Sequence, residues 1–282
     1  MDFTLKTYLN LIKALLWQGF MFQTFADFLK NPEYKVIILR NDVDRLPENS
    51  LEFARIQTKM GIRSTFYFRA IPESWNEGII RQIAELGHEV GYHYEDVALI
   101  AQRYKDIMAE EKLVKMAIES FTINLEKLKK IVIVKTICMH GSPISRWDNR
   151  LLWKYYNYHD FGIVGEPYFD IDNNEVLYLT DTGRRWDGNN YNIRDREFNN
   201  KTRKEFKNNT KNKVATSQFF SRSFHSTLEL IKIAEKGLLP DKIMMTFHPQ
   251  RWTNRPLPWI TELIWQNTKN IAKYFLIKSI NE

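Results

Sequence analysis

The chain has 282 residues, 44% of them hydrophobic, and a single cysteine, Cys138. Its length suffices for one large core, while the lone cysteine excludes an internal disulfide framework and a zinc cluster built from thiolates. The net charge is +7, from 41 Lys and Arg against 34 Asp and Glu, but no nucleic-acid-binding motif accompanies it, so we expect no nucleic-acid partner.

The first predicted element is an amphipathic helix near the N-terminus. Its apolar side chains recur at helical spacing, at Leu5, Leu9, Ile12 and Leu16. Charged residues interrupt this stretch and no small-residue cleavage site follows, so we predict neither a signal peptide nor a transmembrane segment. The expected location is cytoplasmic. We expect residues 1–30 to form a helical extension packed on the main domain.

Strands and helices alternate along the rest of the chain. The predicted strands are residues 35–40, 64–69, 88–92, 132–140, 176–180, 214–220 and 242–248. The predicted helices are residues 49–61, 76–86, 97–128, 226–237 and a last one from about 258. This alternation predicts an α/β fold with a largely parallel sheet, closed as a barrel. Because no linker or fixed-period repeat interrupts it, we expect a single domain over residues 1–282.

A basic run over residues 193–213 carries much of the excess positive charge. Its aromatic side chains are sparse, so we interpret it as a solvated loop. The alternative is that it attracts an anionic substrate or a membrane surface.

Chemically capable side chains follow four of the predicted strands. They are Asp42, Asp44, His93, His140 and His248. In a barrel, the C-terminal ends of the strands share one rim, so these residues are expected to converge. Each has a simpler interpretation by itself, since an Asp can cap a helix and a His can hydrogen-bond the backbone. Together, two histidines and a carboxylate are the usual ligands of a catalytic zinc that keeps one position open for water.

Three segments resemble the polysaccharide deacetylase (NodB-like, carbohydrate esterase family 4-like) superfamily. They are RNDVDRLPENSLEFARIQTKMGIRSTFYFR, GHEVGYHYED and the late TFHPQRW. The resemblance runs from about residue 35 to 252 and implies an irregular barrel of about seven strands. It also implies a metal-dependent hydrolase, with zinc the first choice of metal. The expected reaction removes an N-acetyl or similar N-acyl group from a sugar or a sugar-containing precursor, nucleotide- or lipid-linked ones included, in surface polysaccharide metabolism.

The resemblance assigns roles to the first two motifs. The family's first motif is a pair of aspartates, which implies Asp42 as the catalytic base and Asp44 as a metal ligand, with the swapped roles as the alternative. The second motif is normally His-x-x-x-His; His93 matches its first member, whereas Val97 occupies the second position.

The missing ligand must therefore come from elsewhere. The family's third motif usually places an arginine at a strand end, where this chain has His140. We expect His140 to complete the metal site, with Glu95 as the rival ligand. His88 is interpreted as structural. His248 matches the histidine of the last motif, which would be the general acid.

Candidate substrate contacts lie in two later segments. Arg184, Arg185 and Trp186 in TDTGRRWDG, and Arg251 beside His248, could contact a sugar or an anionic group. The alternative for the first segment is a surface turn anchored by a buried Trp186. The alternative function for the chain is a catalytically degraded carbohydrate-binding or scaffold protein of the same fold.

Overall fold

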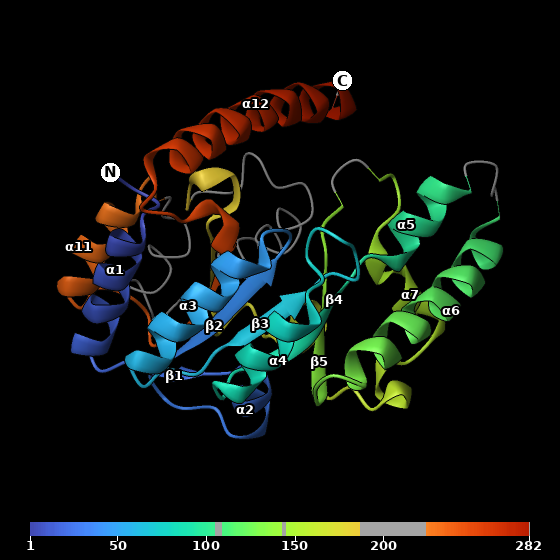
Figure 1. The fold of residues 1–282 in the computed structure, drawn as a ribbon, viewed down its shortest axis with the longest axis horizontal. Helices are drawn as coiled ribbons and strands as arrows, with labels where there is room; N and C mark the ends of the chain where they lie inside the picture. The colour runs from blue at the N-terminus through green and yellow to red at the C-terminus, as the bar shows by residue number, and fades with distance from the viewer. Residues whose placement is uncertain (105–108, 143–144, 187–223, 282) are drawn as a thin grey trace, which may run out of the picture. The chain divides into compact units, whose positions relative to one another are not determined.

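The structure, a computed structural model, describes residues 1–104, 109–142, 145–186 and 224–281 (Figure 1). Seven strands form one sheet in the order β5-β4-β3-β2-β7-β6, and β1 pairs with β2 outside that path. The strands are β1 (Met21–Gln23), β2 (Val36–Val43), β3 (Thr65–Phe68), β4 (Glu89–Tyr94), β5 (Val134–Met139), β6 (Leu177–Thr180) and β7 (Lys242–Phe247). The predicted α/β class is confirmed, and the seven strands of the described residues include β1, which was not predicted. In the described residues the path is open from β5 to β6, so closure into a barrel stays a prediction.

Helices alternate with these strands. The α-helices are α1 (Leu5–Trp17), α2 (Phe25–Lys30), α3 (Pro47–Lys59), α4 (Glu77–Glu85), α5 (Asp96–Arg103), α6 (Glu110–Lys129), α7 (Leu152–Tyr155), α8 (Pro167–Asp170), α11 (Thr227–Glu235) and α12 (Pro256–Asn281). Short 3-10 turns occur at η1 (Asn149–Leu151), η2 (Tyr158–Phe161), η3 (Thr182–Arg184) and η5 (Pro249–Arg251). Nowhere in the described part of the chain is a helix long and apolar enough to span a membrane.

Two predicted elements need correction. The single helix expected over residues 97–128 is wrong, because the chain leaves helical geometry at Tyr104 (φ −118°, ψ 72°) and α6 starts only after the extended Ala109. Neither Gly nor Pro marks this break, while acidic residues in the first turn of α6 favour a new helix start there. The helical extension expected over residues 1–30 is interrupted by β1. The strand predicted at residues 214–220 lies outside the described residues.

The chain divides into two compact units. The first unit comprises residues 1–23, 32–40 and 172–282, and in it α1 and α11 lie side by side (Figure 1). Its core includes an aromatic group in which Tyr8 lies edge-on to Phe247 and Trp252. The second unit comprises residues 24–31 and 41–171. The interpretation of the whole chain as a single domain stays a prediction.

The entry into β4 is set by a predicted helix stop in the second unit. The side chain of Asn76 caps α4 by accepting a hydrogen bond from the N–H of Ile79, at 3.1 Å. Gly87 ends the helix with φ +87°, a left-handed conformation that suits glycine. The strand that follows is buried along most of its length, so its side chains have fixed surroundings.

Close packing inside the sheet fixes β4 against β3. Gly91 pairs with Tyr67 in the parallel register, and a Cβ at residue 91 would collide with the Tyr67 ring and with the carbonyl oxygen of Thr136, at 2.6 Å. The Tyr67 hydroxyl is itself hydrogen-bonded to the Thr136 hydroxyl at 2.9 Å, so the ring has little room to move. Only glycine fits at this position without a shift of the neighbouring strands.

We predict that Gly91→Ala lowers the free energy of unfolding by about 1–3 kcal/mol, the usual cost of overpacking. Gly78→Ala is the matched control, because a Cβ there meets only the Asn76 side chain, at 3.4 Å, and alanine favours the helix. Urea unfolding followed by circular dichroism measures both variants. Equal stability of Gly91→Ala and the wild type would show that the strands move apart freely.

Candidate metal centre

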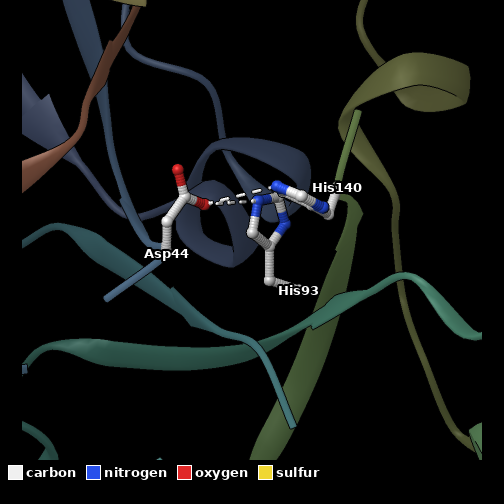
Figure 2. Close-up of side chains that lie close together, drawn as sticks. All are labelled: Asp44, His93 and His140. Carbon is white, nitrogen blue, oxygen red and sulfur yellow. Dashed lines mark ion pairs between the residues drawn. The ribbon is translucent and has the colours of Figure 1, made fainter. Parts of the chain in front are cut away.

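The candidate ligands lie in the second unit, in or directly after three strands. Asp44 directly follows β2, His93 lies in β4, and His140 directly follows β5. The carboxyl ends of parallel strands meet at one edge of a sheet, which is where open α/β folds gather their chemistry. Figure 2 shows the three side chains pointing toward one another. The convergence expected for these three residues is therefore present in the structure.

The spacing of the ligand atoms suits a small cation. One carboxylate oxygen of Asp44, Oδ1, lies 3.8 Å from His93 Nε2 and 3.7 Å from His140 Nε2 (Figure 2). One ligand atom from each of the three residues fits within 4.8 Å of the other two. These separations are too long for hydrogen bonds. They are close to the roughly 3.4 Å that separates two ligand atoms of a tetrahedral zinc with bonds near 2.1 Å.

The hydrogen bonds of the two imidazoles fix which nitrogen faces Asp44. His93 Nδ1–H donates to the carbonyl oxygen of Cys138 at 2.9 Å, and His140 Nδ1–H donates to Glu95 Oε2 at 2.8 Å. Both acceptors require a proton on Nδ1, so in the neutral rings both Nε2 atoms carry lone pairs. Two lone pairs facing a carboxylate oxygen repel it unless a cation lies among them. The donor set therefore fits a divalent metal ion.

A second carboxylate, that of Asp42, lies beside this group. It is buried, and its Oδ2 is 3.6 Å from His93 Nε2. Asp44 lies near both histidines and forms with them the group whose ligand atoms fit within 4.8 Å of one another, and Asp42 lies near His93. The geometry thus favours Asp44 over Asp42 as the ligand, and the assignment of both roles stays a prediction.

Glu95, the rival ligand, lies behind His140. Its carboxylate accepts hydrogen bonds from Arg69 Nε and Nη2, both at 2.7 Å. Burial alone would raise the pKa of Glu95, but the hydrogen bond from His140 and the charges of His140 and Arg69 outweigh it and hold the pKa below its usual value. Glu95 contacts the Nδ1 side of His140, whereas the grouped ligand atoms lie on the Nε2 side.

The other residues of the second motif are packed into the fold. Val97 is fully buried in the first turn of α5 and has no atom that can bind a metal. His88 is held by backbone groups: Nδ1 accepts from the N–H of Ser64 at 3.2 Å, and Nε2–H donates to the carbonyl of Ala54 at 3.0 Å. These contacts agree with a structural role for His88.

A separate polar cluster surrounds His248 in the first unit. Asp181, fully buried, accepts from His248 Nδ1–H at 2.6 Å, from Arg251 Nη1 at 2.9 Å and from the Trp252 indole at 2.6 Å. Burial would raise the pKa of Asp181, but the charges of His248 and Arg251 lower it overall. Sequence reasoning missed Asp181. It directly follows β6, so the rule that selected Asp44 and His140 would also have found it.

The predicted substrate-contacting residues have protein partners in the first unit. Arg184 is buried and donates to the carbonyl of Trp259 at 3.1 Å, and the Trp186 indole donates to the hydroxyl of Thr227 at 2.9 Å. Arg185 Nη2 lies 3.1 Å from His225 Nδ1. Arg251 binds Asp181, as described above. A role of these four residues in substrate binding stays a prediction.

Comparisons with known proteins give only distant similarities. No protein-family model and no curated protein matches the sequence. Among solved structures, the chain is similar to BA3943, described as a CE4 family pseudoenzyme from Bacillus anthracis, with 11% identity and a TM-score of 0.41; the match covers 86% of this chain and 63% of that one, less than two thirds of its length.

Two further solved structures are similar at the same level. A mutant of the peptidoglycan deacetylase PdaC from Bacillus subtilis has 11% identity, a TM-score of 0.34, and coverage of 88% and 98% of the two chains. The Xyl-CE4 domain of a multidomain xylanase, from the hindgut metagenome of Trinervitermes trinervoides, has 12% identity, a TM-score of 0.35, and coverage of 88% and 92%. At these TM-scores, the function of this chain has to rest on the chemistry of its own residues.

The surroundings of His88 predict a pH dependence of stability. Burial lowers the pKa of His88 in the folded protein from 6.5 to about 4. Between these values the unfolded chain binds more protons than the folded one, so stability falls as the pH is lowered from about 6.5 to about 4. The total loss is on the order of 3 kcal/mol, from 1.36 kcal/mol per unit of pKa.

Urea unfolding at a series of pH values measures this effect as the difference between the wild type and His88→Gln. We expect the wild type to lose more stability than the variant across this window. His159→Gln, at an exposed position, is the control and should follow the wild type. If the stabilities of the wild type and His88→Gln changed with pH in the same way, the lowered pKa of His88 would be contradicted.

Proposed function

We propose that the protein is a metal-dependent hydrolase that removes an N-acetyl or similar N-acyl group from a sugar-containing substrate. The observation that carries the proposal is the orientation of two imidazoles. Their Nδ1 atoms are held by Cys138 and Glu95, so both Nε2 atoms face Asp44. The family resemblance of the segments that contain these residues supports the reaction type. The choice of zinc and a cytoplasmic location are part of the same proposal.

The residues that would hold the cation are Asp44, His93 and His140. Two imidazoles and a carboxylate suit zinc and related ions. When bound, such a cation acts as a Lewis acid on the amide carbonyl and lowers the pKa of a water at the site. A three-residue ligand set leaves room for that water, as catalytic sites require.

Asp42 is the candidate proton acceptor. It is buried beside the same imidazole as the ligand Asp44, with 3.6 Å between its Oδ2 and His93 Nε2. A carboxylate in this position can take the proton that the water loses when it attacks the carbonyl. General-base assistance of this kind accelerates a reaction by about 10²–10⁴-fold.

His248 is the candidate proton donor to the departing amine. Because its Nδ1–H donates to Asp181 at 2.6 Å, Nε2 is the atom left to carry and release a proton. Asp181 holds the ring in this tautomer and orientation, as a buried carboxylate does for a catalytic histidine. The chemistry of this pair therefore suits the general acid that the family resemblance implies for His248.

The test of the function is acetate release from N-acetylated sugars, measured together with bound metal by elemental analysis. We predict that the zinc-loaded wild type releases acetate and that Asp42→Asn keeps its metal while turnover falls about 10²–10⁴-fold. Asp160→Asn, at an exposed position, is the control and should leave both quantities unchanged.

Each contrary outcome has a distinct meaning. Loss of the metal in Asp42→Asn would make Asp42 a ligand and reverse the two aspartate roles. Full turnover in Asp42→Asn would show that another group is the base. A zinc-loaded wild type that deacetylates no N-acetylated sugar would overturn the proposed function.

A further inference from the structure

We propose that Glu95, held by Arg69, is a positioning residue that makes His140 a metal ligand. The inference rests on the proposed metal site and adds to it a residue that touches no substrate. In the family motif the residue at position 97 is a histidine that binds the metal, and here it is Val97. The proposed site has His140, from another strand, as the ligand in its place. A ligand at this new position needs neighbouring side chains that fix the orientation of its ring.

The contact between Glu95 and His140 determines which nitrogen of the His140 ring carries the proton and which can bind a metal. Glu95 Oε2 lies 2.8 Å from His140 Nδ1, and the Ser142 hydroxyl lies 3.1 Å from the same nitrogen. The carboxylate can only accept, so Nδ1 donates and Nε2 presents its lone pair to Asp44, 3.7 Å away. Histidine ligands of metals are commonly fixed in this way by a carboxylate on the other nitrogen.

Arg69 fixes the plane of the Glu95 carboxylate. Its Nε and Nη2 bind the two carboxylate oxygens at 2.7 Å each, and the side chains of Arg69 and Glu95 are only 17% and 4% exposed. Nη1 of the same guanidinium lies 3.4 Å from the carbonyl oxygen of Asp44. A two-pronged arginine–carboxylate pair has a defined geometry, which a single contact lacks. Arg69 thus connects the chain segments that carry two of the three ligands.

The two histidines differ in what holds them. His93 is 2% exposed and donates to a backbone carbonyl, that of Cys138, inside the sheet. His140 is 18% exposed and directly follows its strand, and its Nδ1 contacts side chains rather than backbone. Removing the Glu95 charge should therefore release His140 and leave His93 in place. Such a selective effect separates a positioning role from a general contribution to folding.

The experiment is a double-mutant cycle on zinc affinity, measured by competition with a chromophoric chelator. We expect Glu95→Gln to weaken zinc binding by about 10–100-fold, the usual cost of removing such a partner. In the His140→Ala background, Glu95→Gln should cause no further loss, because it acts through His140. Arg69→Gln keeps the Glu95 carboxylate but removes the group that orients it, so this variant should also weaken zinc binding. It replaces Glu95→Gln in the experiment if Glu95→Gln does not fold.

Two controls separate this role from general effects. Asp27→Asn breaks an arginine–carboxylate pair elsewhere in the second unit, Arg63 with Asp27 at 3.0 Å, and should leave zinc affinity unchanged. In the metal-free protein, nitrogen-15 NMR should find the His140 proton on Nδ1 in the wild type and shared between both nitrogens in Glu95→Gln.

The outcomes that overturn the inference differ from those that overturn the function. Unchanged zinc affinity in both Glu95→Gln and Arg69→Gln, or equal losses for Glu95→Gln with and without His140, would show that Glu95 does not act through His140. No zinc binding by the wild type would instead refute the metal site on which the proposed function depends.

Discussion

The contacts of two imidazole Nδ1 atoms, those of His93 and His140, determine the chemistry of this site. His93 gives its Nδ1 proton to the carbonyl of Cys138, and His140 gives its own to Glu95. Each bond turns a lone pair on Nε2 toward the carboxylate of Asp44. With the protons on the other nitrogens, N–H groups instead of lone pairs would face Asp44, and neither imidazole could bind a cation there. The parallel sheet supplies the frame, since it brings the ends of β2, β4 and β5 to one edge.

The same chemical pattern recurs in the first unit. There, His248 gives its Nδ1 proton to Asp181, and Arg251 binds the same carboxylate oxygen at 2.9 Å. In both clusters a histidine is oriented by a buried carboxylate that an arginine holds. The chemistry that each histidine can perform depends on what its Nε2 faces. Nε2 of His140 faces a second carboxylate and suits a metal, whereas Nε2 of His248 is the atom suited to proton transfer.

Much of this arrangement could be predicted from the sequence, because it depends on where strands end. Continuous apolar runs predict β2 and β5, and polar residues at their ends then share an edge of the sheet. The expectation that His140 supplies the ligand that Val97 cannot supply also follows from this rule, since His140 follows β5, which pairs with β4. The strand-end rule requires no knowledge of side-chain directions, which is why the sequence alone predicts that Asp44, His93 and His140 lie close together.

The rest depends on contacts between residues far apart in the sequence. The direction of Glu95 is set by Arg69, 26 positions earlier, and no local pattern reports that pairing. Likewise, the partner of His248 is Asp181, 67 positions away. The sequence does not show the break after Tyr104, because helical spacing of apolar residues continues across it, from Ile100 to Val114, both buried. Periodicity reports which face of a helix is buried, and it does not report where the helix stops.

The most direct test of the account is a crystal structure of the zinc-loaded protein with anomalous data collected on both sides of the zinc edge. The account predicts one strong anomalous peak bonded to Asp44 Oδ1, His93 Nε2 and His140 Nε2, at about 2.0–2.2 Å from each. A peak bonded to Glu95 in place of His140, or no peak among these three residues, would contradict it.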